Sequence, residues 1–513
     1  MDEPEDHTAA SGRYCALVAI CMAALILPLS FTGGAVATPA IGASFAAAPS
    51  SLAWITNAFM LSFGSLLMAA GALADLYGRK RLFMLGLVLL VIASMLLASV
   101  RSIAWLDALR AVQGVAAAAV LASGSAALAQ AFEGHARTRA FSVLGTTFGL
   151  GLAFGPMICG LLTEHFGWRS IFLCTAALAA VSLLAAAMRM SESRNPQAQY
   201  LDLPGVLSFS TTLGLLTTAI ILGPHAGWRS PLMLGLFAGA LLSLLAFVAI
   251  EAGASRRGRQ PMLELSLFKY PRFVGVQILP IGTCFCYIVL IVLLPLRLIG
   301  VEGATPLHSG LIMLALSAPM LVVPLLAAWL NRWASAATLS AGGFLVAAAG
   351  LYAIAHVAIG DHLQLMLAML IIGIGTGLPW GLMDGLAVSV IAKEQAGMAA
   401  GIFNTTRVAS EGVALAITLA LLTAQVGAGL THTFPPNRSH ELAQRLVMGD
   451  LSQVQGLDPL MLQAAYQEGF ATLMLILSGL TVLSAFTVFF FIGHPGRAAS
   501  ALGHEGTMPK GEP

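Results

Sequence analysis

Three ionisable residues in the last third of the chain lie in stretches that are otherwise apolar. Arg407 and Glu411 are four residues apart, which places them on one helix face where they can pair. Asp384 follows Pro379 and Trp380 and has no obvious partner close by in the sequence. Acids inside apolar helices are costly, and they often carry protons in transporters. We therefore take Asp384, Arg407 and Glu411 as candidates for proton coupling.

Each of these residues also has a plainer interpretation. Arg407 and Glu411 can form a neutral structural pair with no role in transport. Asp384 can lie near the inner membrane interface rather than act as a second proton carrier. The sequence leaves both alternatives open.

Arg110 is a fourth candidate, because it is an arginine near the start of another apolar stretch. We expect it to face the interior of a helix bundle, where a partner or water can offset its charge. The alternatives are an arginine that extends its side chain to the outer interface, or one that simply pairs with Asp107 one turn earlier.

The composition indicates which environment surrounds these residues. The 513-residue chain is 58% hydrophobic and only 9% charged, whereas soluble domains carry about 25% charged residues. Most of its surface must therefore face lipid. The net charge of +2 and the lack of a basic stripe argue against nucleic-acid binding.

No pattern of residues indicates an enzyme. The six cysteines lie in apolar stretches without metal-ligand spacing, and we interpret them as packing residues. We find no nucleophile–base arrangement and no phosphate-binding or cofactor motif. We expect no catalytic residue, no metal and no cofactor.

The apolar runs predict an all-α polytopic membrane protein with fourteen spans, because about 20 apolar residues cross the hydrocarbon layer. Six are expected by residue 189, two at 204–224 and 231–250, and six more at 273–296, 306–329, 336–357, 363–390, 398–424 and 469–492. Twelve spans remain possible if the pair at 204–250 does not cross.

These spans divide the chain into two six-helix bundles joined by two additional helices. The expected segments are an N-terminal tail at 1–13, a bundle at 14–190, a connector at 191–260, a second bundle at 261–493 with an extracytoplasmic loop at 427–467, and a C-terminal tail at 494–513.

Basic residues indicate the orientation. With both termini in the cytoplasm, the inner segments hold Arg13, Arg79, Lys80, Arg81, Arg137, Arg139, Arg189, Arg194, Arg256, Arg257, Arg259, Lys269, Arg272, Arg332, Lys393, Arg497 and Lys510. The outer loops then hold only Arg101, Arg169, Arg229, Arg297, Arg438 and Arg445. We expect an integral protein of the bacterial plasma membrane.

A conspicuous motif follows the second span, with the sequence GALADLYGRKR over residues 71–81. Gly71 and Gly78 allow close approach and a tight turn, and Asp75 can pair with Arg79 or with the N-terminus of a neighbouring helix. Such a pair can hold one conformation and release another. The plainer interpretation, which also covers Lys80, is a positively charged inner loop.

Two further motifs occur in the first bundle. One is the run LRAVQG at 109–114, and the other is a series of glycines in the fifth span, Gly145, Gly149, Gly151, Gly155 and Gly160, with Pro156 among them. The glycines form a smooth face for close helix packing, and Pro156 bends the helix. A seam of this kind suits alternating access, although ordinary packing is an equally simple interpretation.

These residues resemble motifs A, B and C of the major facilitator superfamily. The fourteen spans, the connector DLPG at 202–205 and the long loop before the last span are similar to the fourteen-span drug:H⁺ antiporter family. The resemblance implies a conformational switch at motif A, an influence of Arg110 on proton movement, and an antiporter seam at the glycines.

The first span departs from that family. Ser30 stands where the family usually has an acid several residues before an Ala-x-Pro, here Ala37–Pro39. Because serine does not titrate in this range, we expect the coupling residue to lie elsewhere, at Asp384 or Glu411, or the transporter not to be a standard antiporter.

The substrate cavity is expected between the bundles near the midplane. Its candidate lining residues are Asn57, Gln113, Gln277, Tyr287, Trp380 and Asn404, each of which can instead join two helices. The leading hypothesis is a monomeric, proton-coupled exporter of amphiphilic or cationic organic compounds. The alternative is a specific carrier for a vitamin, sugar or other metabolite, with import as one option.

Overall fold

The protein is described by a computed structural model covering residues 5–132, 134–194, 202–256, 263, 265–390, 396–449 and 457–493. Within these ranges every regular element is a helix, and fourteen helical stretches are long and apolar enough to cross a membrane. This confirms the predicted all-α fold. The predicted C-terminal tail and the basic residues Arg257, Arg259, Lys393, Arg497 and Lys510 lie outside the described residues.

The first bundle contains six long helices. They are α1 (Glu5–Phe45), α2 (Pro49–Tyr77), α3 (Arg79–Ser99), α4 (Ile103–Ala131), α5 (Gly134–Phe166) and α6 (Arg169–Arg189). Gly78 separates α2 from α3 with a φ of 113°, a conformation that favours glycine because it has no Cβ. Spans alternate in direction, so this turn lies at the same end as the start of α1. We call it the Gly78 end.

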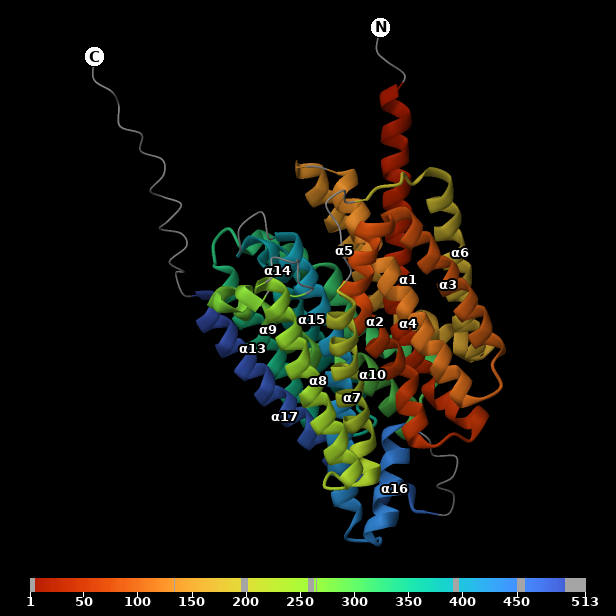
Figure 1. Ribbon diagram of the computed structural model, residues 1–513. Helices are drawn as coiled ribbons and strands as arrows, with labels where there is room; N and C mark the ends of the chain where they lie inside the picture. Colours follow the sequence, from red (N-terminus) through yellow and green to blue (C-terminus); the bar gives the residue numbers. More distant parts are fainter. Residues whose placement is uncertain are drawn as a thin grey trace, which may run out of the picture.

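Two linker helices follow, α7 (Leu203–Ala226) and α8 (Pro231–Arg256). Asp202 caps the N-terminus of α7, because its carboxylate accepts a hydrogen bond from the backbone N–H of Gly205 at 2.9 Å. One side of α7 packs against α2 and α15, and α8 packs on α7 (Figure 1). The linker pair therefore covers the junction between the bundles.

The second bundle is less regular than the first. One span combines α9 (Pro271–Thr283), the π-helical turn η2 (Cys284–Ile288), α10 (Val289–Pro295) and a second π turn, η3 (Leu296–Val301). Pro280 and Pro295 precede the two π turns, and proline removes a backbone donor from a helix. The remaining elements are η1 (Leu265–Lys269), α11 (Pro306–Ser317), η4 (Ala318–Leu321), α12 (Val323–Leu330), α13 (Ala336–Ala355), α14 (His362–Ser389), α15 (Ala396–Leu430) and α17 (Pro459–Gly493).

The predicted loop at 427–467 is more structured than expected. It contains the helix α16 (Pro436–Val447), which buries Leu442 and Val447 on one side and exposes polar residues on the other. The last span also begins at Pro459, earlier than the predicted residue 469. Figure 1 shows α16 at the end opposite the start of α1, which we call the α16 end.

Arg297 corrects a second expectation. The sequence placed it in an outer loop, but the helical span continues to Val301 and only 1% of the Arg297 side chain is exposed. Its Nε lies 2.7 Å from Oε1 of Glu302, which is 3% exposed, and His362 Nδ1 lies 3.7 Å from the other oxygen of that carboxylate. The guanidinium also lies over the ring of Phe470. Arg297 can be buried because Glu302 lies beside it and neutralises its charge. Counting apolar residues along the sequence does not show this contact.

Replacing Arg297 by methionine should leave Glu302 buried without its cation and lower the free energy of unfolding by about 3–5 kcal/mol. Adding Glu302→Gln should restore part of the loss. Thermal unfolding of the purified protein in detergent measures both changes.

The matched control is Glu441→Gln, which removes the exposed partner of Arg445 on α16. An exposed pair of this kind contributes less than about 1 kcal/mol, so its midpoint should hardly move. A double variant no more stable than Arg297→Met alone would show that Glu302 does not depend on Arg297.

Candidate transport site

The turn between α2 and α3 carries the first set of predicted residues. Oδ1 of Asp75 accepts two hydrogen bonds from Arg79, at 2.8 and 3.0 Å, and Arg79 also bonds Gln130 of α4. The predicted pairing of Asp75 with Arg79 is therefore present. Gly71, by contrast, has open space where a side chain would stand.

Glu192, in the segment after α6, also contacts this turn, and the motif gave no indication of that contact. Its carboxylate accepts hydrogen bonds from the backbone N–H groups of Lys80 at 3.0 Å and Arg81 at 3.2 Å, at the start of α3. A negative charge is favourable at a helix N-terminus. The backbone N–H of Arg79 donates to Ser193 O at 2.8 Å, so the segment after α6 holds the turn in place.

Arg110 lies inside the first bundle with no exposed surface, which excludes a side chain that extends to the interface. Its Nε donates to Ile55 O at 2.7 Å, its Nη1 donates to Gln113, and its guanidinium lies over the ring of Phe59. Gln113 in turn donates to Ser94 at 2.9 Å. Gln113 therefore positions Arg110 and is not free to contact a substrate in this conformation.

The glycines of α5 serve two different contacts. A Cβ on Gly155 would come within 2.4 Å of Thr32 Oγ1, and one on Gly151 within 2.8 Å of Leu25 O, so both pack against α1. A Cβ on Gly160 would come within 2.2 Å of Pro306 O in α11. Gly160 is thus part of a seam between the two bundles.

The partner helix contributes a glycine to the same seam. A Cβ on Gly310 would lie 2.6 Å from Pro156 O, and Glu164 accepts a hydrogen bond from Leu307 N at 3.0 Å. This part of the seam lies toward the α16 end. Nearer the Gly78 end, Gly145 has open space around it and Gly149 only touches Met320 O at 4.0 Å.

The second bundle brings the predicted charges together, with one change of partner. Arg407 pairs with Asp384 of α14, with Nη1 3.5 Å from Oδ1, rather than with Glu411. The Asp384 side chain is 63% exposed and that of Arg407 is 12% exposed. Glu411 is buried one turn further along α15. The sequence could not show that α14 passes beside α15 at this level.

Arg407 also reaches the first bundle. Its guanidinium carbon lies 5.8 Å from the ring centroid of Phe148 in α5. An arginine over an aromatic face is attracted by the ring quadrupole. Phe148, which the sequence analysis missed, therefore places this charge at the boundary between the bundles.

Two aromatic candidates lie close to each other in the second bundle. Tyr287 and Trp380 have ring centroids 6.2 Å apart, and Trp380 is four residues before Asp384 on α14. Gln277 is nearly buried, and neither atom of its amide has a hydrogen-bond partner. Asn404, half-buried, precedes Arg407 by one turn.

Two polar residues of the first bundle, Asn57 and Ser30, are buried. Asn57 is fully buried and donates to Ala53 O in its own helix at 2.9 Å, while its side-chain oxygen has no partner. Ser30 is also buried, and its hydroxyl has no partner. Position 30, where the family that this chain resembles usually has an acid, is therefore buried and uncharged.

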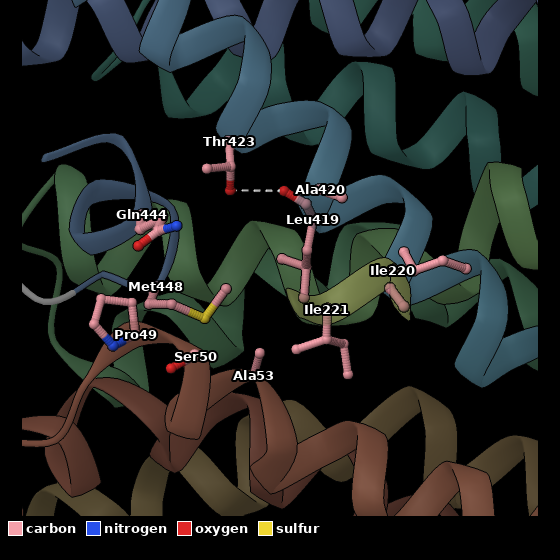
Figure 2. Close-up of a pocket in the computed structure, with 11 residues that line it drawn as sticks. Pro49, Ser50, Ala53, Ile220, Ile221, Leu419, Ala420, Thr423, Gln444 and Met448 are labelled. Atoms are coloured by element: carbon pink, nitrogen blue, oxygen red, sulfur yellow. Dashed lines mark hydrogen bonds between the residues drawn. The ribbon is translucent and has the colours of Figure 1, made fainter. Parts of the chain in front are cut away.

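Figure 2 shows a hollow where α2, α7, α15 and α16 meet. Ala53 comes from α2, Ile220 and Ile221 from α7, Leu419 from α15, and Met448 follows α16. From this hollow toward the Gly78 end the seam is tight, because a Cβ on Gly64 would come within 2.8 Å of Ala409 Cα. Linker helix α7 therefore borders a second seam between the bundles.

Comparison with known proteins identifies the family to which this architecture belongs. The family model described as Major Facilitator Superfamily matches residues 18–202 and 203–415. The chain belongs to the Major Facilitator Superfamily. It is an integral membrane protein of a family of transporters.

Several characterised major facilitator proteins are similar to this chain. The multidrug resistance protein Stp of Mycobacterium tuberculosis is 31% identical over 401 residues, covering 77% of this chain and 73% of Stp. The cephamycin export protein CmcT of Amycolatopsis lactamdurans is 31% identical, covering 79% of this chain and 84% of CmcT.

A solved major facilitator structure has the same fold. It is a bacterial homolog of the human lysosomal transporter Spinster in an inward-facing, unoccupied conformation, with a TM-score of 0.65 and 15% identity over 96% of this chain and 98% of that one. The predicted membership of the drug-antiporter branch agrees with these relatives.

The seam at Gly160 yields a prediction for this major facilitator protein. Gly160→Ala should prevent α5 and α11 from closing at the α16 end, because the new Cβ would overlap the backbone of Pro306. We expect transport of ethidium by reconstituted protein to fall at least about tenfold, since packed interfaces tolerate little added volume.

Gly145→Ala is the matched control, because nothing lies within 4 Å of the position where its Cβ would be. It should transport nearly as well as the native protein. Equal rates for the two variants would contradict a role for the Gly160 contact.

Proposed function

We propose that this chain is a proton-coupled exporter of amphiphilic or cationic organic compounds that works by alternating access as a monomer in the bacterial plasma membrane. Protons would enter from outside and drive the substrate out of the cell. Both termini would face the cytoplasm, so the Gly78 end is the inner end and the α16 end the outer end.

The proposed coupling site rests on one observation. Arg407 lies at the boundary between the bundles, near an exposed acid, Asp384, and a buried acid, Glu411. It pairs with Asp384 at 3.5 Å, lies over Phe148 of the first bundle, and is one turn from the buried Glu411. A charge in the membrane needs a partner. When Glu411 is ionised it competes for Arg407, and when it is protonated Arg407 can remain with Asp384.

This competition links protonation to the position of the bundles. Protonated Glu411 leaves Arg407 on Asp384 and Phe148, the arrangement in the described conformation. Loss of the proton would draw Arg407 toward Glu411 and away from Phe148, which weakens one contact across the boundary. A ligand or proton shifts a conformational equilibrium only through such a difference between states.

The other predicted groups would serve the same cycle. Asp75, Gly78, Arg79 and Lys80 would act as the inner conformational switch. Gly160 and Pro156 would form the outer seam with α11, while Gly151 and Gly155 would hold α5 against α1. Arg110, held by Ile55 and Gln113, would influence proton movement in the first bundle. Tyr287, Trp380, Gln277 and Asn404 would contact the substrate.

The relatives support export rather than uptake. Stp is named a multidrug resistance protein and CmcT a cephamycin export protein. An importer of one metabolite finds no support among these names. The buried Ser30 supports placing the coupling acid in the second bundle.

The predicted chain segments are part of this proposal. Residues 14–190 and 261–493 would form the two moving bodies, and residues 191–260 the connector with α7 and α8. The part of the 427–467 loop that includes α16 would lie outside the cell.

Inverted membrane vesicles test the coupling directly. Acidification of the lumen should drive ethidium uptake by the native protein, and an uncoupler should abolish it. Glu411→Gln should lose gradient-driven uptake by at least about a hundredfold, because the amide cannot release a proton. The variant should still exchange labelled for unlabelled ethidium, since the substrate contacts remain.

Asp384→Asn should reduce gradient-driven uptake less, because Asp384 is a partner of Arg407 and not the buried proton carrier. Glu468→Gln is the matched control, since Glu468 is an exposed acid on α17. Native-like gradient-driven uptake by both Glu411→Gln and Asp384→Asn would overturn the site assignment. Uptake by native protein that ignores the gradient would overturn antiport.

A further inference from the structure

A second hollow lies at the Gly78 end of the first bundle, away from the boundary between the bundles. It has a volume of about 390 Å³ and is bounded by α1, α4 and the segment after α6. Ligand pockets in proteins usually measure about 300–1,000 Å³. The hollow is therefore large enough for a compact organic molecule, but not for a whole two-chain lipid.

The walls of this hollow are divided by polarity. Ala16, Ile20, Ala127 and Leu128 form a buried apolar part, whereas Arg13, Gln130, Ser191 and Ser193 supply polar groups. Arg13 is exposed and Ala131 is half-buried, while Leu128 is fully buried behind them. This arrangement suits a ligand with an apolar body and one polar head.

The charges around the hollow favour a negative head. Among the residues that the structure describes, Arg13 forms no ion pair, and no acid lines the hollow. Two acids at the α2–α3 turn already have partners, because Asp75 accepts from Arg79 and Glu192 accepts from two backbone N–H groups of α3. Arg13 is thus left as the cation that a carboxylate, sulfonate or phosphate group can bind.

We propose that this hollow binds a compact amphiphilic organic anion, with its acidic group on Arg13 and its apolar body against Ala16, Ala127 and Ala131. The site is distinct from the transport site, which lies at the bundle boundary around Arg407. Its ligand would regulate transport and would not itself be the exported compound.

The regulation follows from two residues shared with the α2–α3 turn. Gln130 lines the hollow and accepts a hydrogen bond from Arg79, and Ser193 lines it while its carbonyl accepts from the backbone N–H of Arg79. A bound anion would hold Gln130 and Ser193 in place. This would stabilise the Asp75–Arg79 pair and slow the conformational change that transport requires.

Calorimetric titration of the purified full-length protein tests the site, with 2-naphthalenesulfonate as the probe. We expect saturable binding that Arg13→Gln weakens about tenfold or more. Ala131→Leu, which fills the hollow from α4, should also weaken it. Arg189→Gln is the matched control, because Arg189 is an exposed arginine at the end of α6 that does not line the hollow.

Two further probes define the ligand class. The cation 2-naphthyltrimethylammonium has the same apolar body, and its binding should not depend on Arg13. Inorganic phosphate has charge without an apolar body and should not compete with the sulfonate at equal concentration. No saturable binding of the sulfonate, or binding unchanged in Arg13→Gln and Ala131→Leu, would overturn the site.

Transport provides the second readout. The sulfonate should slow ethidium transport by native protein and by Arg189→Gln, and should have little effect on Arg13→Gln. Binding without any slowing would overturn the regulatory link to Arg79.

Discussion

A charge inside a hydrocarbon layer must have a partner, and this constraint determines where the protein can place its few ionisable side chains. Three buried or nearly buried arginines meet it in different ways. Arg110 bonds a carbonyl and an amide within the first bundle, Arg297 pairs with Glu302 within the second, and Arg407 pairs with Asp384. The guanidinium of Arg407 also lies over Phe148 of the opposite bundle.

That difference separates structural charges from the proposed mobile one. The Arg297–Glu302 pair is enclosed on all sides, so changing either partner leaves a charge without compensation. The Arg407–Asp384 pair has one exposed acid, and a second acid lies one turn away. Under the proposed function, Glu411 gives Arg407 an alternative partner, which a switch requires. Glycines such as Gly160, which packs against Pro306, let the two bundles approach closely. In the proposed switch, a change in the partner of Arg407 would therefore affect how the bundles pack.

Much of the fold could be predicted from sequence because the bilayer imposes a simple length rule. Fourteen apolar runs gave fourteen helical spans, and Gly78 marked the turn between α2 and α3. The same rule failed near residue 297, because an apolar count cannot show that Glu302 neutralises an arginine inside the protein. It also missed α16, whose helical periodicity lies within a polar stretch.

The candidate site was predicted less completely, since helix spacing reveals only neighbours on the same helix. That spacing suggested the pair Arg407 and Glu411, whereas the structure pairs Arg407 with Asp384 of another helix. Glu192, Phe148 and the two functions of the α5 glycines likewise depend on contacts between distant segments. Gln113 was a candidate either to line the cavity or to join two helices, and in the structure it accepts a hydrogen bond from Arg110 and donates one to Ser94 of α3.

The central claim of the proposed function is that Glu411 is the acid whose proton is exchanged for substrate, so substrate binding should release that proton. Proton release on adding ethidium to purified protein in weakly buffered detergent solution, followed with a pH-sensitive dye, tests it most directly. The account predicts release by the native protein and by Glu468→Gln, and none by Glu411→Gln. Undiminished proton release from Glu411→Gln would contradict it.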